Sequence, residues 1–207
     1  MGLEKIFRYT SYLIKIMLLS IIIFDIINAK YSQLFITSLT LVLLLIPSLF
    51  RRKYDAIIPL EIEILIVIFI FGTLFLGEIH NYYELYEYWD VYLHTLSGIL
   101  LGLLGFVIVY SIIETNTTNN LTPFFVALFT FSFAVMIGVI WEIFEFSMDI
   151  FFGLNMQKSG LIDTMTDLIV DSIGALIVAI TSYFYMKKVN KFGIIYTMID
   201  KIVTKKR

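Results

Sequence analysis

The sequence predicts an all-α, polytopic membrane protein with six transmembrane helices, and three observations lead to this fold class. The chain of 207 residues is 59% hydrophobic and only 15% charged, with a mean hydropathy of +0.90. A soluble domain of this length is rarely so apolar. Several windows of about 20 residues carry few charges, which is the length that a helix needs to cross about 30 Å of hydrocarbon. The basic residues are also distributed unevenly among the connections between these windows.

The spans are predicted within a single transmembrane domain of residues 1–207. They cover residues 10–28, 33–50, 58–79, 91–113, 121–146 and 163–186. The first loosely resembles a signal peptide, but Lys15 and Asp25 interrupt it, so we expect an uncleaved span. The connections are short, so neighbouring helices should pack antiparallel. Gly98, Gly102 and Gly105 give the fourth span a face of small residues, which favours close helix packing.

Two further segments are predicted to lie at the membrane interface. Residues 80–92 are rich in Tyr and Trp, as in the aromatic belts found at headgroup level. Residues 190–207 place apolar side chains at helical spacing with lysines away from them, which predicts a basic amphipathic helix on the anionic inner leaflet.

The basic residues predict the orientation. Twelve of the 15 Lys and Arg fall in segments that lie inside if the N-terminus is cytoplasmic, and Lys15 lies near the same end of its span. Only Lys30 and Lys158 fall in outer segments. Cytoplasmic loops carry an excess of Lys and Arg. We therefore expect a multi-pass protein of the cell (inner) membrane with both termini in the cytoplasm.

Acidic and His side chains recur on one face of the last three spans, all near the outer side. They are Asp90 and His94 in the fourth span, Glu142, Glu145 and Asp149 at the end of the fifth, and Asp163, Asp167 and Asp171 at the start of the sixth. Spacings of three, four and seven residues place each set on one helix face. A carboxylate in hydrocarbon costs roughly 2.5–3.5 kcal/mol on insertion scales, so these residues are functional candidates.

The outer side has too few cations to pair these acids. Eleven Asp and Glu residues fall there, against Lys30, Lys158 and the two histidines. Buried carboxylates must be paired, protonated or bound to a metal. Three interpretations follow: a metal site, a proton or ion relay, or a structural polar core closed by hydrogen bonds and water.

A divalent metal is the sharpest of these interpretations. Carboxylates with imidazole suit Zn, Mn or Fe, and oxygen ligands alone suit Ca or Mg; the chain has no cysteine to supply a thiolate. The predicted ligands are Asp90, His94, Glu142, Glu145, Asp163 and Asp167, of which the first four are also the predicted catalytic residues. The residues predicted to relay protons or to orient the ligands are Asp149, Asp171, His80 and Thr164.

The same residues carry a family resemblance. The blocks Asp90-x-x-x-His94-x-x-x-Gly98, Glu142-x-x-Glu145 and Asp163-Thr164-x-x-Asp167, followed by Gly174-Ala175, resemble the YjdF-like family of bacterial inner-membrane proteins. The likeness covers residues 88–180, and Phe146 stands where that family usually has Trp. More distantly, the chain resembles VanZ-like membrane proteins, which are linked to glycopeptide tolerance and envelope biology. The resemblance implies a fold and the place of a site, without a reaction.

The leading functional hypothesis is a membrane-embedded, metal-dependent hydrolase or transferase that acts on a lipid or lipid-linked envelope substrate at the outer leaflet. The alternatives are an ion- or proton-coupled transporter and a non-catalytic membrane subunit with a buried polar core. The expected partners are membrane lipids and a lipid-linked substrate, and no nucleic acid.

Overall fold

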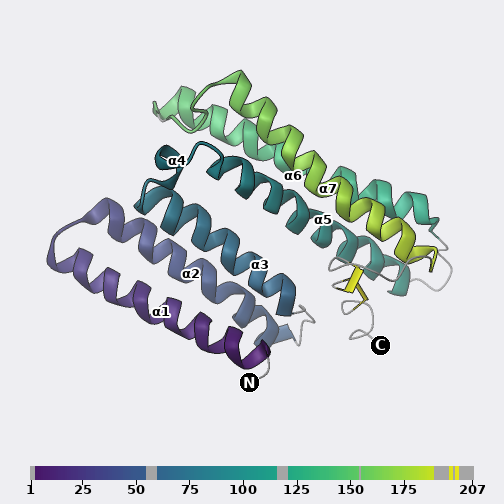
Figure 1. Ribbon diagram of the computed structural model, residues 1–207, viewed down its shortest axis with the longest axis horizontal. Coiled ribbons are helices and arrows are strands. Elements are labelled where there is room, and N and C mark those ends of the chain that lie inside the picture. Colours follow the sequence, from purple (N-terminus) through teal and green to yellow (C-terminus); the bar gives the residue numbers. More distant parts are fainter. Residues whose placement is uncertain are drawn as a thin grey trace. The chain divides into compact units, whose positions relative to one another are not determined.

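The computed structural model describes residues 3–54, 60–115, 121–153, 155–188, 196–197 and 199–200. These residues form helices joined by short turns, and none of them lies in a strand, so the predicted all-α class is confirmed. The chain divides into two compact units, residues 1–89 and 90–207 (Figure 1). The predicted single domain stays a prediction.

The first unit contains five helical elements. They are α1 (Leu3–Ile27), α2 (Tyr31–Tyr54), α3 (Leu60–Ile70), the π-helix η1 (Phe71–Ile79) and α4 (Tyr82–Leu85). A short turn joins α1 and α2, which run antiparallel (Figure 1). Their apolar faces meet η1 and α3 around a small core of buried side chains. The core residues are Leu18, Leu44, Val67 and Phe75.

The aromatic segment packs against the end of the third predicted span. The indole Nε1 of Trp89 donates a hydrogen bond to the backbone oxygen of Gly72, at 3.2 Å. The Trp89 ring meets the Tyr82 ring edge-on, with centroids 5.0 Å apart. Tyr and Trp combine an apolar ring with a polar group, which suits them to a membrane boundary. The segment therefore packs against η1, the π-helical continuation of α3.

The second unit contains the three long helices α5 (Trp89–Thr115), α6 (Pro123–Phe152) and α7 (Leu161–Met186), which run side by side (Figure 1). The hydroxyl of Thr122 caps the start of α6 by accepting from the Phe125 N–H, and Pro123 fills the first position, where no N–H is needed. Gly153 ends α6 in the left-handed region, with φ 67°. The helix thus continues to Phe152, beyond the predicted span 121–146, whose bounds stay a prediction.

Five helices are long and apolar enough to cross a membrane. They are Tyr9–Ile27, Ile62–Ile79, Trp89–Tyr110, Pro123–Phe152 and Leu161–Met186. Five of the six predicted spans are thus supported by helix length and composition. The second, 33–50, lies within α2, but its described apolar stretch, Gln33–Leu45, is shorter than a crossing needs. The second predicted span, 33–50, therefore stays a prediction.

Most of the predicted amphipathic tail, residues 190–207, lies outside the described residues. Within it, residues 196–197 and 199–200 are helical, and Ile199 is buried. The Tyr185 hydroxyl near the end of α7 lies 3.3 Å from the Asp200 carboxylate oxygen, within hydrogen-bond distance. The described part of the tail thus packs back onto α7.

Glycines let α5 and α7 approach at the level of the acidic residues. A Cβ atom on Gly98 would collide with the backbone oxygen of Asp171, and one on Gly174 would lie 2.5 Å from the backbone oxygen of Thr95. The collisions are with backbone, so a side-chain rearrangement cannot relieve them. The predicted small-residue face of the fourth span is confirmed at Gly98, and it holds Asp171 against α5.

We expect Gly98→Ala to separate α5 from α7 and to lower the stability of the protein. Overpacking of a tight contact costs typically 1–3 kcal/mol, so a fall of about that size is expected. Thermal unfolding in detergent, followed by size-exclusion elution, measures it. Leu104→Ala is the control, because Leu104 lies on an exposed face of the same helix. Equal melting temperatures for the two variants would contradict the close crossing.

Candidate functional site

His94 of α5 lies among three carboxylates that come from α5 and α7. Its Nδ1 is 3.2 Å from Asp171 Oδ2. Its Nε2 is 3.7 Å from Asp90 Oδ1 and 3.9 Å from Asp167 Oδ2. His94, Asp167 and Asp171 are buried, and Asp90 is half-buried. The structure thus brings together four predicted site residues around one imidazole ring.

Asp171 fixes the orientation of this ring. An ionised carboxylate only accepts hydrogen bonds, so Nδ1 donates to Asp171, and a neutral ring then has its lone pair on Nε2. Ser97, one turn after His94, donates a short 2.5 Å hydrogen bond to the other oxygen of Asp171. Nε2 is therefore directed toward Asp90 and Asp167. Ligating histidines in metal proteins are commonly held in this way.

Asp90, His94 and Asp167 offer one donor atom each, and these atoms all lie within 4.8 Å of one another. Oxygen and nitrogen ligands lie about 2.0–2.2 Å from a zinc ion, so two ligands of one ion are at most about 4.4 Å apart. The distances of 3.7 and 3.9 Å from Nε2 meet this limit, and the two carboxylate oxygens lie within 4.8 Å of each other, so a small closure of the group would bring all three onto one ion. The Asp167 Oδ2 atom is buried and accepts no hydrogen bond from the described residues. A divalent cation would satisfy it.

The two glutamates of α6 lie beside this group. Glu142 and Glu145 are buried, and each is close enough to His94 for its charge to act on them. The Thr164 hydroxyl of α7 acts on the Glu142 carboxylate as a hydrogen-bond donor, and neither oxygen has another hydrogen-bond partner among the described residues. Trp141 Nε1 donates to Glu145 Oε1 at 2.9 Å. Glu142 and Glu145 are not among the three residues whose donor atoms lie within 4.8 Å of one another.

Two other predicted residues lie at the edge of the cluster. Asp163 is partly exposed and feels the charges of Asp90 and Lys158. Thr164 Oγ1 accepts a 2.7 Å hydrogen bond from the Gln157 side chain. Both residues lie in the first turn of α7.

Asp149 binds the backbone of the turn between α6 and α7. Its Oδ1 accepts from the Met156 N–H at 2.7 Å, and its Oδ2 accepts from the Gln157 N–H at 2.8 Å. The carboxylate thus closes this turn. Its predicted relay role stays a prediction.

His80 belongs to the first unit, where its Nδ1 lies 2.9 Å from the Phe75 backbone oxygen. Its ring also packs on the Phe75 ring, with centroids 4.5 Å apart. These contacts account for its position at the end of η1. Its predicted relay role stays a prediction.

Ser97, Trp141 and Gly138 were not among the predicted site residues. Ser97 follows His94 by three residues, and Trp141 precedes Glu145 by four, so helical spacing could have indicated both. Gly138 precedes Glu142 by the same four residues, but a glycine has no side chain to suggest a role. A Cβ atom there would lie 2.9 Å from Asp171 Oδ2, so its small size lets α6 close over this carboxylate.

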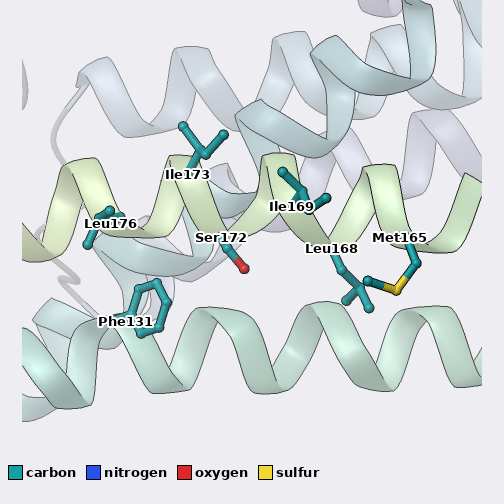
Figure 2. Close-up of a pocket in the computed structure, with 7 residues that line it drawn as sticks. All are labelled: Phe131, Met165, Leu168, Ile169, Ser172, Ile173 and Leu176. Atoms are coloured by element: carbon teal, nitrogen blue, oxygen red, sulfur yellow. The ribbon is translucent and has the colours of Figure 1, made fainter. Parts of the chain in front are cut away.

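A pocket of about 410 Å³ lies elsewhere, along α6 and α7 (Figure 2). Its lining is apolar apart from Ser172, and no predicted site residue contributes to it. The lining residues are Phe131, Met165, Leu168, Ile169, Ser172, Ile173 and Leu176. Such a lining offers no group for acid–base or metal chemistry, so we place the candidate site at His94.

Comparison with known proteins gives the family. Residues 10–188 match the family described as "Predicted membrane protein (DUF2238)". The chain belongs to this family. The match includes every residue named in the candidate site and runs through both compact units. Membership of the DUF2238 family establishes a predicted membrane protein, in agreement with the five apolar helices.

A relative of this DUF2238 chain is an uncharacterized protein of Thermotoga maritima. The two are 32% identical over 151 residues, which are 70% of this chain and 73% of the relative. No solved structure matches the chain. The residues around His94 are therefore the best indication of a function.

Proposed function

We propose that this protein is a membrane-embedded, metal-dependent enzyme, a hydrolase or transferase acting on a lipid or lipid-linked envelope substrate at the outer leaflet. One observation carries the proposal: the Nε2 of His94 faces the carboxylates of Asp90 and Asp167, while Asp171 holds Nδ1. Two carboxylates directed at one imidazole lone pair repel each other unless a cation or proton lies between them. A set of one nitrogen and two oxygen donors suits Zn, Mn or Fe.

The residues divide the proposed chemistry among them. Asp90, His94 and Asp167 would hold the cation, which when bound polarises a phosphoryl or carbonyl oxygen or acidifies a water molecule. Glu142 and Glu145 lie on the facing helix, where a carboxylate can take a proton from an attacking water. Asp171 and Ser97 keep the imidazole in one orientation.

The depth of the site supports lipid chemistry over passage through the membrane. The cluster lies in the first half of α7, between Asp163 and Asp171. Beyond Asp171, the buried described residues of α7 carry no acidic, basic or imidazole group. They are Gly174, Ala175, Val178, Ala179 and Ser182. A polar path that ends near mid-helix fits a headgroup that enters from one side.

The proposed site at the outer leaflet requires that both termini lie in the cytoplasm. We expect reporters fused after Lys53 and at the C-terminus to read cytoplasmic, and a tag beside Lys158 to be accessible from outside, because Lys and Arg concentrate on the cytoplasmic side. Cysteine accessibility labelling in intact cells measures each position, and the chain has no native cysteine to interfere. A cytoplasmic Lys158 would contradict an outward-facing site.

The second candidate function is ion- or proton-coupled transport. The chain of contacts from Ser97 through Asp171 to His94 favours it, because linked carboxyl and imidazole groups can carry protons. An Asp171→Asn variant separates the functions when assayed for lipid composition in cells and for ion uptake in reconstituted vesicles. Altered lipids without uptake support the enzyme. Uptake that Asp171→Asn abolishes, with unchanged lipids in all site variants, would overturn it.

The resemblance to YjdF-like and VanZ-like proteins agrees with this proposal, since it directs attention to envelope biology. It carries less weight than the geometry, because it gives no reaction. A non-catalytic subunit with a polar core is the third interpretation. It predicts that the site variants lose stability and bind no metal.

A further inference from the structure

Glu142 and Glu145 are not explained by a cation held at Asp90, His94 and Asp167. The two glutamates are 4% and 9% exposed, which is unusual for carboxylates in a predicted span. They lie one turn apart on α6 and face the same side. Their donor atoms fall outside the group that lies within 4.8 Å. A cation held at Asp90, His94 and Asp167 therefore does not account for their burial.

The charge on the cluster supports the same conclusion. Six carboxyl groups lie close enough to His94 to interact with its charge. They are Asp90, Asp163, Asp167, Asp171, Glu142 and Glu145. One divalent cation balances two of these charges. Lys158 acts on Asp163 at the outer edge, and Lys187 and Lys188 follow the opposite end of α7. A single bound ion thus leaves carboxyl groups on the side facing α6 that need either protons or a second cation.

Glu142 is the clearest case. Both of its carboxylate oxygens are buried, and the Thr164 hydroxyl can donate to only one of them, so at least one oxygen has no hydrogen-bond donor among the described residues. Glu145 is held differently, because Trp141 orients one of its oxygens and leaves the other free of that contact. The pair consists of one oriented and one unsatisfied carboxylate, which is a suitable arrangement for a cation.

We propose that Glu142 and Glu145 form a second divalent-cation site beside the first, so that the cluster is a two-cation centre. This inference rests on the proposed function, because it assumes a cation at His94. The second site offers oxygen donors only, which favours a hard cation such as Mg²⁺ or Mn²⁺. Paired cations of this kind, about 3.5–4 Å apart, clamp the oxygens of a phosphoryl group in many enzymes. The substrate class that fits is therefore a lipid phosphate.

The test is the number of Mn²⁺ ions bound to the purified full-length protein. Equilibrium dialysis against Mn²⁺ should give two ions per chain for the wild type and one for Glu142→Gln/Glu145→Gln. Electron paramagnetic resonance should show magnetic coupling between the ions in the wild type and an isolated ion in the double variant. Glu87→Gln is the control, because it removes an exposed carboxylate of the aromatic segment and should leave two ions bound.

The outcomes separate this inference from the proposed function. One ion in the wild type, unchanged in the double variant, would overturn the second site and leave the first intact. No bound ion would overturn both. If the double variant does not fold, Glu145→Gln alone is used, since its amide oxygen can still accept from Trp141. Two uncoupled ions, or two ions in both proteins, would also contradict the assignment.

Discussion

Asp167→Asn is expected to abolish cation binding at the His94 group and with it the stabilisation that the cation provides. A ligand that binds only the folded state stabilises it by about 2.7 kcal/mol at 100 times its Kd. The amide keeps the size of Asp167 but removes the charge of a side chain that is 2% exposed. Differential scanning fluorimetry in detergent, with and without Mn²⁺ or Zn²⁺, should show a rise in Tm for the wild type and none for the variant.

Asp149→Asn provides the matched control for this experiment. Asp149 accepts from two backbone N–H groups of the α6–α7 turn, so its amide should lower the Tm of the metal-free protein. Its response to added metal should be the same as in the wild type. A wild-type Tm that does not change with any divalent ion would contradict the metal hypothesis.

Asp171→Ala is expected to weaken cation binding by about 10–100-fold, the usual cost of losing a group that orients a ligating histidine. Without Asp171, the His94 ring loses the acceptor for Nδ1 and is free to turn. Asp171→Asn should retain more affinity, because its amide oxygen can still accept from Nδ1. Isothermal titration with Mn²⁺ gives the order wild type, Asn variant, Ala variant.

Ser172→Ala controls for the change of a neighbouring residue on α7. Ser172 lines the apolar pocket and is not part of the His94 group (Figure 2). Its removal should leave the affinity unchanged. Equal affinities for the wild type and both Asp171 variants would show that Asp171 does not position His94.

The sequence predicted the helices well because length and hydropathy decide them. Five of the six predicted spans are helices of sufficient length and apolarity. Gly153, with its positive φ, ends α6, and Phe151 and Phe152 before it continue the apolar helix beyond Asp149.

The grouping of the site was predictable only in part. Helical spacing placed Asp90 with His94 and Asp167 with Asp171, and the alternation of antiparallel neighbours put the starts of α5 and α7 at the same depth. Spacing could not give the rotation of each helix, which decides that Nδ1 meets Asp171 while Nε2 faces Asp167. That rotation follows from the close crossing at Gly98 and Gly174.

Asp149 shows that helical spacing alone does not reveal the contacts of a side chain near a helix end. It shares a helix face with Glu142 and Glu145, so its spacing predicts a site residue. The structure uses its carboxylate for the backbone of a turn that lies seven and eight residues later. A pattern on a helix cannot predict how the following loop folds back, so the spacing could not indicate these two hydrogen bonds.

X-ray absorption spectroscopy of the metal-loaded protein is the most direct test of a metal centre at His94, because it reports the atoms bound to the ion. We expect one imidazole nitrogen with carboxylate oxygens in the wild type, and loss of the imidazole signal in His94→Ala. An ion surrounded by oxygen alone in the wild type, or a spectrum that His94→Ala leaves unchanged, would contradict a metal centre at Asp90, His94 and Asp167.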